Sequence, residues 1–355
     1  MEGLSMDLIW EEYGLDQLQQ GLSNLFPGNE FSLRQVLAQI MQGDVLGAIR
    51  DIANAMLGDM GSQLAGLRNV LLWLVMLGMV SALMSHFMEI FDKHQVADIS
   101  FYFMYLLLTA VLLASFGRIA QVASTTMENI LLFIRLLVPT YLMAVGVASG
   151  TATAGASYQL VLLLIYGVER VLIGGLLPFI YSYVLLAVVN GIWIEEKLSM
   201  LMELLEKGIK AALKAIIGIV TGISVFQSVI TPVIDTVKTS AMQKIVAAVP
   251  GIGGAADSLA SMVIGSAVVI KNSIGVVLLI LLMSVCLSPL LQILLTACCM
   301  KLAAAVMGII SDKRITACTN KVGEGSMMLL KITGTALLLF LISISLVAVS
   351  TNHGL

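Results

Sequence analysis

Long apolar runs separated by short polar stretches make up most of the chain after residue 68. The runs cover residues 69–90, 101–117, 130–149, 158–190, 211–230, 274–296 and 327–349. An α-helix needs about 20 apolar residues to cross the hydrocarbon core of a membrane. The run 158–190 is too long for one untilted helix, so we expect two spans or a helical hairpin that breaks near Gly174 and Gly175. The pattern predicts an all-α, polytopic membrane protein with about eight transmembrane helices.

The first 68 residues have a different pattern. They contain nine acidic residues and three arginines, and apolar positions such as Leu33, Val36, Leu37 and Ile40 recur at helical spacing. We therefore predict a small helical N-terminal domain over 1–68. The first twenty residues lack the basic segment and apolar run of a signal peptide, so the first membrane span or a preceding leader is expected to direct insertion.

Residues 191–210, GIWIEEKLSMLMELLEKGIK, alternate charged and apolar positions at helical spacing. Apolar residues at i, i+3 and i+4 opposite glutamates and lysines predict an amphipathic helix at the membrane interface. This segment divides the membrane part into a first helical region over 69–190 and a second over 211–350.

The stretch AAVPGIGGAADS, residues 247–258, is the densest glycine turn of the chain. It lacks the lysine and hydroxyl residue of a phosphate-binding GxxxxGK[ST] loop, and no strand precedes it as a dinucleotide site requires. Pro250, Gly251, Gly253 and Gly254 instead predict a hinge within a helical hairpin over 233–273. Such a hairpin can lie on the membrane surface, re-enter it, or line a cavity or docking surface.

Charge and composition narrow the class of protein further. Only 12% of residues are charged, and the net charge is -3, so the chain does not neutralise nucleic-acid phosphates in bulk. The four cysteines form no CxxC pair, so neither a disulfide framework nor a thiolate metal site is expected. With eight spans, ten basic residues fall on one side of the membrane and four on the other, which places the N-terminal domain outside the cytoplasm.

Arg135, Glu169 and Arg170 are charged residues that fall within the apolar runs. Charges at bilayer depth cost about 3 kcal/mol on insertion scales, so they usually face protein or water and are paired. We expect Arg135 to form an ion pair with Glu169 that fixes helix order. Arg170 stands next to Glu169. Alternatively, these charged residues line a substrate path, or their side chains extend to the membrane surface.

The chemistry-bearing residues give no sign of catalysis. No Ser-His-Asp or Cys-His set is suitably spaced, and the chain has three histidines. His86, Glu89 and Asp92 share a helical face, but no second ExxH pair faces them, so interfacial solvation is the simpler interpretation. We expect no enzymatic activity, no cofactor and no metal.

The C-terminal part has a recognisable order of features. They are Pro250 with Gly253-Gly254, the pair Lys271-Asn272, Pro289 within a span, the stretch Lys301 to Ala305, and Asp312 with Arg314. In this order the sequence resembles the stage III sporulation protein AE family, most clearly over residues 200–350.

The resemblance implies an integral membrane component of the secretion-like channel complex between mother cell and forespore, required after engulfment. It implies a multi-pass location in the mother-cell membrane around the forespore. The implied partners are the other proteins of the complex, including its ATPase and ring-forming subunits. The alternative function from the sequence is a secondary transporter or permease for a small solute.

Overall fold

The computed structural model describes residues 66–83, 94–149, 166–192, 197–246 and 286–350, together with Gln20, Gln39, Gly47, Arg50, Leu164 and Met283. These five segments are helices and short connections, as the all-α prediction requires. The labelled elements are α5 (His94–Ser149), the π-helical turn η1 (Leu172–Leu176), α7 (Leu177–Asn190), α8 (Ser199–Val246) and α10 (Lys313–Ser350). Gly66–Leu83 and Cys286–Ile310 form two further helices.

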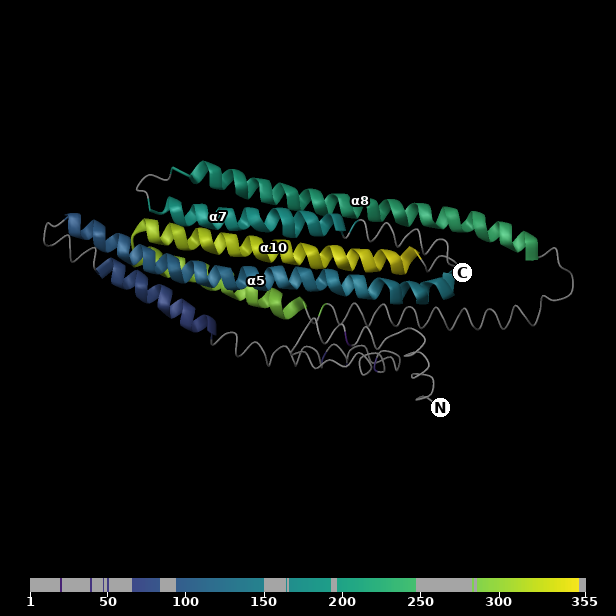
Figure 1. Ribbon diagram of the computed structural model, residues 1–355, viewed down its shortest axis with the longest axis horizontal. Helices are drawn as coiled ribbons and strands as arrows, with labels where there is room; N and C mark the ends of the chain where they lie inside the picture. Colours follow the sequence, from purple (N-terminus) through teal and green to yellow (C-terminus); the bar gives the residue numbers. More distant parts are fainter. Residues whose placement is uncertain are drawn as a thin grey trace.

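Helix α10 lies at the centre of the described bundle. It packs against α5, α7 and α8, and Figure 1 shows the four labelled helices running side by side along the long axis. Its buried residues lie on several faces, including Ile315, Met328 and Leu337. A helix buried on most of its circumference is an interior element, so α10 organises the packing of its neighbours.

Helix α5 corrects one prediction. The sequence separated spans at 101–117 and 130–149, but the structure has one helix of 56 residues through both. The polar residues responsible for the predicted break are Arg118, Gln121, Thr125 and Glu128, all exposed. Their 3-4-3 spacing places them on one face of the helix.

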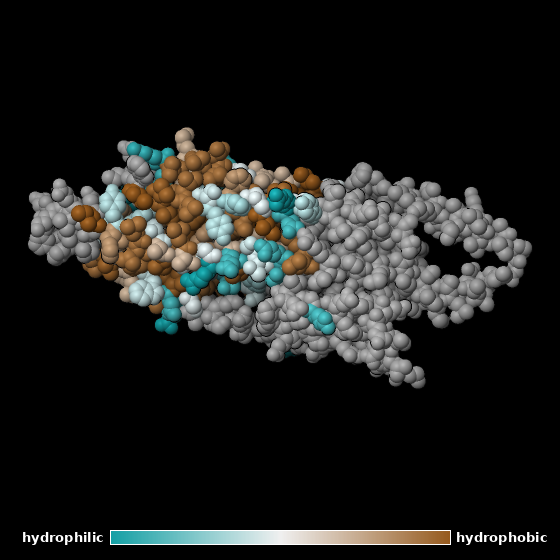
Figure 2. Space-filling model, viewed as in Figure 1, coloured by the Kyte–Doolittle hydropathy of each residue, from teal (hydrophilic) through white to brown (hydrophobic). Residues whose placement is uncertain are grey.

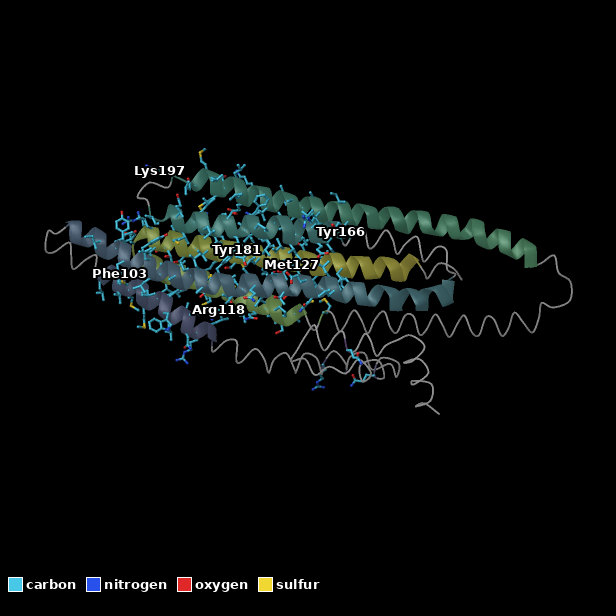
Figure 3. All side chains as sticks on the ribbon, in the orientation of Figure 1. Phe103, Arg118, Met127, Tyr166, Tyr181 and Lys197 are labelled. Atoms are coloured by element: carbon cyan, nitrogen blue, oxygen red, sulfur yellow. The ribbon has the colours of Figure 1, made fainter. Side chains whose placement is uncertain are left out.

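The opposite face of α5 explains why the helix continues through this polar section. Ala120, Ala123 and Met127 are almost fully buried there. Met127 lies within the bundle and Arg118 on its outer side (Figure 3). A hydropathy window averages the two faces and so reports a polar loop where the structure has an amphipathic helix.

The irregularity predicted at Gly174 and Gly175 is present in a different form. The helix Tyr166–Asn190 does not break into two spans; it contains η1, in which the Leu177 N–H bonds to the Leu172 carbonyl. Pro178 follows directly. A proline has no N–H and its ring clashes with the carbonyl four residues earlier. The wider π-helical turn accommodates the proline without ending the helix.

Five of the described helices are long and apolar enough to cross a membrane. They are Gly66–Leu83, Phe101–Leu132, Tyr166–Asn190, Cys286–Ile310 and Lys313–Leu341. The predicted span 211–230 is part of α8, which is not among these five. The total of about eight stays a prediction, since much of the chain lies outside the described residues.

The predicted amphipathic segment 191–210 overlaps the start of α8. Glu203 forms an ion pair with Lys207 at 2.6 Å, and Glu206 pairs with Lys210. The hydrogen bond from Lys207 lowers the pKa of Glu203, and the hydrogen bond to Glu206 raises the pKa of Lys210. The buried apolar residues of this part of α8 are Met202, Ile209, Leu213 and Ile216. Helix α8 continues to Val246, so position 210 is not a helix end.

Large apolar side chains also cover much of the outside. Trp73, Phe103, Leu106 and Ile309 are all more than half exposed. Figure 2 shows apolar residues over most of the described surface in that view. Since lipid rather than water solvates such a surface at low cost, the exterior fits a protein with membrane-spanning helices.

Candidate functional site

A tight turn joins the Cys286–Ile310 helix to α10 and begins the candidate site. Asp312 precedes the first residue of α10, and its carboxylate accepts the backbone N–H of Arg314 at 2.7 Å. This is the N-cap arrangement, in which an acidic side chain satisfies a free N–H of the first helical turn. Asp312 therefore fixes where α10 starts.

Arg314 connects the same turn to α5. Its guanidinium lies 3.6 Å from the ring centroid of Phe101 and donates to the Asp312 carboxylate at 3.4 Å. One helical turn further along α5, Tyr105 donates to the carbonyl of Val188 in α7 at 2.6 Å. Asp312 and Arg314 thus help to hold the first turns of α10 against α5. The hydrogen bond of Tyr105 joins α5 to the end of α7 in the same way.

Replacing Asp312 with alanine should destabilise the protein by about 1 kcal/mol, because the first turn of α10 loses its cap. Asp312→Asn keeps an oxygen that accepts the same N–H and should cost clearly less. The measurement is the thermal unfolding midpoint of the detergent-solubilised protein. Equal losses for both variants would show that the cap contributes nothing.

The second part of the site is the partly buried, hydrogen-bonded carboxylate of Glu324 on α10. Tyr183 of α7 donates to Glu324 Oε2 at 2.8 Å, and Lys321 donates to the same oxygen at 3.0 Å. Asn320 donates to Glu324 Oε1 at 3.3 Å. Tyr183 is fully buried, so its hydroxyl depends on this acceptor. Glu324 therefore ties α10 to α7 across 141 positions of sequence.

Glycines on both sides of Glu324 allow two helices to approach α10 closely. A Cβ atom on Gly325 would lie 2.3 Å from Cγ2 of Val184 in α7. On Gly323 it would lie 3.0 Å from Cγ of Lys301 in the Cys286–Ile310 helix. Small residues at such positions let helix backbones pack closely in membranes. The segment Gly323-Glu324-Gly325 is thus a contact point of three helices.

The hydrogen bonds and close contacts around Glu324 form a polar network that holds helices together. A carboxylate within a membrane-length helix is costly, and such residues mark functional or packing sites. Glu324 did not stand out in the sequence. The available signal was a glutamate flanked by two glycines at the start of an apolar run, a pattern that predicts close helix packing around a polar centre. Its partner Tyr183 had no local signal.

The structure places two of the three predicted intramembrane charges. Glu169 is partly buried and lines a cavity of about 30 Å³ among apolar residues of α5 and α10, including Leu131 and Phe340. Arg170 is exposed. Arg135 belongs to α5, one turn beyond Leu131, but its side chain lies outside the described residues, so the Arg135–Glu169 pair stays a prediction.

Other predicted features also lie outside the described residues. These are the hinge Pro250, Gly251, Gly253 and Gly254, the residues His86, Glu89 and Asp92, and most of the N-terminal domain. In the described part of the chain, no group of three or more His, Cys, Asp or Glu side chains is placed to hold a metal ion. All four cysteines are free.

The helical bundle, its five candidate spans and its apolar exterior define a polytopic membrane protein. The family model of stage III sporulation protein AE matches residues 31–351. The chain therefore belongs to the stage III sporulation protein AE family. The match extends well beyond residues 200–350, where the sequence resemblance was clearest.

A curated relative agrees with the family match. Stage III sporulation protein AE of Bacillus subtilis strain 168 is 22% identical over 281 residues, which cover 79% of this chain and 70% of the relative. No solved structure matches the chain. Family membership implies a role in sporulation at stage III.

Proposed function

We propose that the protein is an integral component of the channel complex between mother cell and forespore, needed for endospore development after engulfment. The observation that carries this proposal is the family match over 31–351. The five candidate spans support a multi-pass location, which we assign to the mother-cell membrane around the forespore. The partners in this proposal are the ATPase and the ring-forming subunits of the complex.

Within this complex we assign the protein the role of scaffold or conduit, without catalysis of its own. The cavity beside Glu169, about 30 Å³, has room for about two water molecules and none for a solute. A permease needs a solute-sized polar site near the middle of the membrane. The small size of this cavity therefore supports a scaffold over a solute path at Glu169.

Deletion of the gene in its sporulating host tests the proposal. We expect normal vegetative growth, followed by arrest after engulfment with small, collapsing forespores in membrane-dye microscopy. A wild-type copy at a second locus should restore spore formation. Normal spores, or a defect in growing cells, would contradict the proposal and favour a permease, which purified protein in liposomes would then reveal by moving a defined solute alone.

A further inference from the structure

A groove of about 420 Å³ lies between the Cys286–Ile310 helix and the first turns of α10. Small residues of the first helix leave the space open, and the conspicuous stretch Lys301 to Ala305 supplies three of its lining residues. The lining residues are Lys301, Ala304, Ala305, Gly308, Ser311, Lys313, Thr316, Ala317 and Asn320. The groove is separate from the apolar cavity beside Glu169.

Two positively charged side chains line the groove, and the charge of Lys301 also acts on the carboxylate of Glu324. Among the described residues, neither Lys301 nor Lys313 forms an ion pair. The carboxylate of Asp312 accepts hydrogen bonds from Arg314, and that of Glu324 accepts from its three donors. Two lysines that share an open groove form a site for an anion.

A hydroxyl at the turn end of the groove also lacks a partner. Within the described part of the chain, the buried Oγ of Ser311 has no hydrogen-bond acceptor or donor. The Thr316 hydroxyl donates to the Asp312 carbonyl and keeps its acceptor capacity. Buried polar groups are nearly always hydrogen-bonded in folded proteins, so the Ser311 hydroxyl is an exception in this turn.

The position of the groove decides what kind of anion it meets. It opens at the turn Ser311–Asp312, between two candidate membrane spans, Cys286–Ile310 and Lys313–Leu341. The connection between two spans lies at the membrane surface, where lipid headgroups are concentrated. Lysine side chains at such depths extend toward the headgroup layer.

Apolar side chains border the groove along the same helix. Leu302, Val306 and Ile309 are exposed by 60%, 43% and 84%, and each follows a groove-lining position by one residue. A ligand that occupied the groove with an anionic group would therefore place an attached hydrocarbon chain along this apolar stripe. The surface is complementary to a molecule that is anionic at one end and apolar at the other.

We propose that this groove binds the headgroup of an anionic phospholipid. Lys301 and Lys313 hold the phosphate, and the acyl chains lie along Leu302, Val306 and Ile309. Basic pockets between transmembrane helices are a general mode of anionic-lipid recognition. The inference is independent of the channel proposal, because it rests on the groove alone.

The test is a titration of detergent-solubilised protein with short-chain phosphatidylglycerol, compared with short-chain phosphatidylcholine. We expect the protein to bind phosphatidylglycerol and not phosphatidylcholine. The double variant Lys301→Gln, Lys313→Gln should bind phosphatidylglycerol about thirtyfold more weakly, and Lys301→Arg, Lys313→Arg should retain binding. The unfolding midpoint of each variant is measured without lipid, and an unchanged midpoint shows that the variant is folded as the wild type is.

A charge-matched control separates the groove from general attraction. Lys207→Gln, Lys214→Gln removes two exposed lysines of α8 that do not line the groove and should bind as the wild type does. Equal weakening in this control, or equal affinity for both lipids, would overturn the proposal. Inorganic phosphate that displaces the lipid at similar concentration would identify the ligand as a soluble anion and likewise overturn the lipid assignment.

Discussion

Gly325→Ala should destabilise the protein by about 1–3 kcal/mol and sharply lower the yield of folded protein. The added methyl group would stand 2.3 Å from Val184 Cγ2, far inside van der Waals contact. Val184 is β-branched and buried in α7, so its side chain cannot turn away at low cost. Overpacking of this kind outweighs the gain in helix propensity from glycine to alanine, about 1 kcal/mol.

Gly334→Ala is the matched control in the same helix. No atom lies within 4 Å of the position where its Cβ would stand, so the substitution should be neutral or stabilising by up to about 1 kcal/mol. Both variants are compared by thermal unfolding in detergent and by membrane yield. Similar behaviour of the two variants would show that α7 and α10 do not approach each other at Gly325.

Glu324→Leu should cost about 3 kcal/mol. The substitution removes the acceptor of three hydrogen bonds and leaves the buried Tyr183 hydroxyl without a partner. Hydrogen bonds to charged groups contribute about 1.5–3 kcal/mol each, and an unsatisfied buried donor adds its desolvation penalty. The expected measurement is a large fall in the unfolding midpoint of the solubilised protein.

A double-mutant cycle tests the Tyr183–Glu324 contact itself. Tyr183→Phe combined with Glu324→Leu should cost less than the sum of the single variants by about 1–2 kcal/mol, since the orphaned hydroxyl is gone. Glu203→Leu, at an exposed ion pair on α8, should change stability by about 0.5 kcal/mol or less. Additive effects of the two substitutions would show that the hydroxyl and the carboxylate do not interact.

Local sequence features predicted individual elements of the fold well. The apolar runs predicted helices of membrane length, and Gly174, Gly175 and Pro178 marked the position of the irregular turn η1. The spacing in 191–210 predicted an amphipathic helix, and α8 begins within that segment with ion pairs on its surface. Each of these features depends on residues within one or two helical turns of one another.

The predicted candidate site was less complete than the predicted fold. Asp312 and Arg314 stood out in the sequence as part of the family resemblance, and the structure gives them a cap and a contact with Phe101. Glu324 and Tyr183 did not stand out, because a single glutamate beside an apolar run is also typical of a helix end. Their importance arises only when α7 and α10 lie against each other.

The sequence by itself determined the class of protein, the helical structure and the family, because hydropathy, periodicity and motif order are local properties of the chain. Only the tertiary structure decided that α5 continues through Arg118–Glu128 and that Gly325 meets Val184. Both depend on which face of a helix is covered by a distant segment. Helix packing brings together residues more than a hundred positions apart, and nothing in their local sequence encodes that pairing.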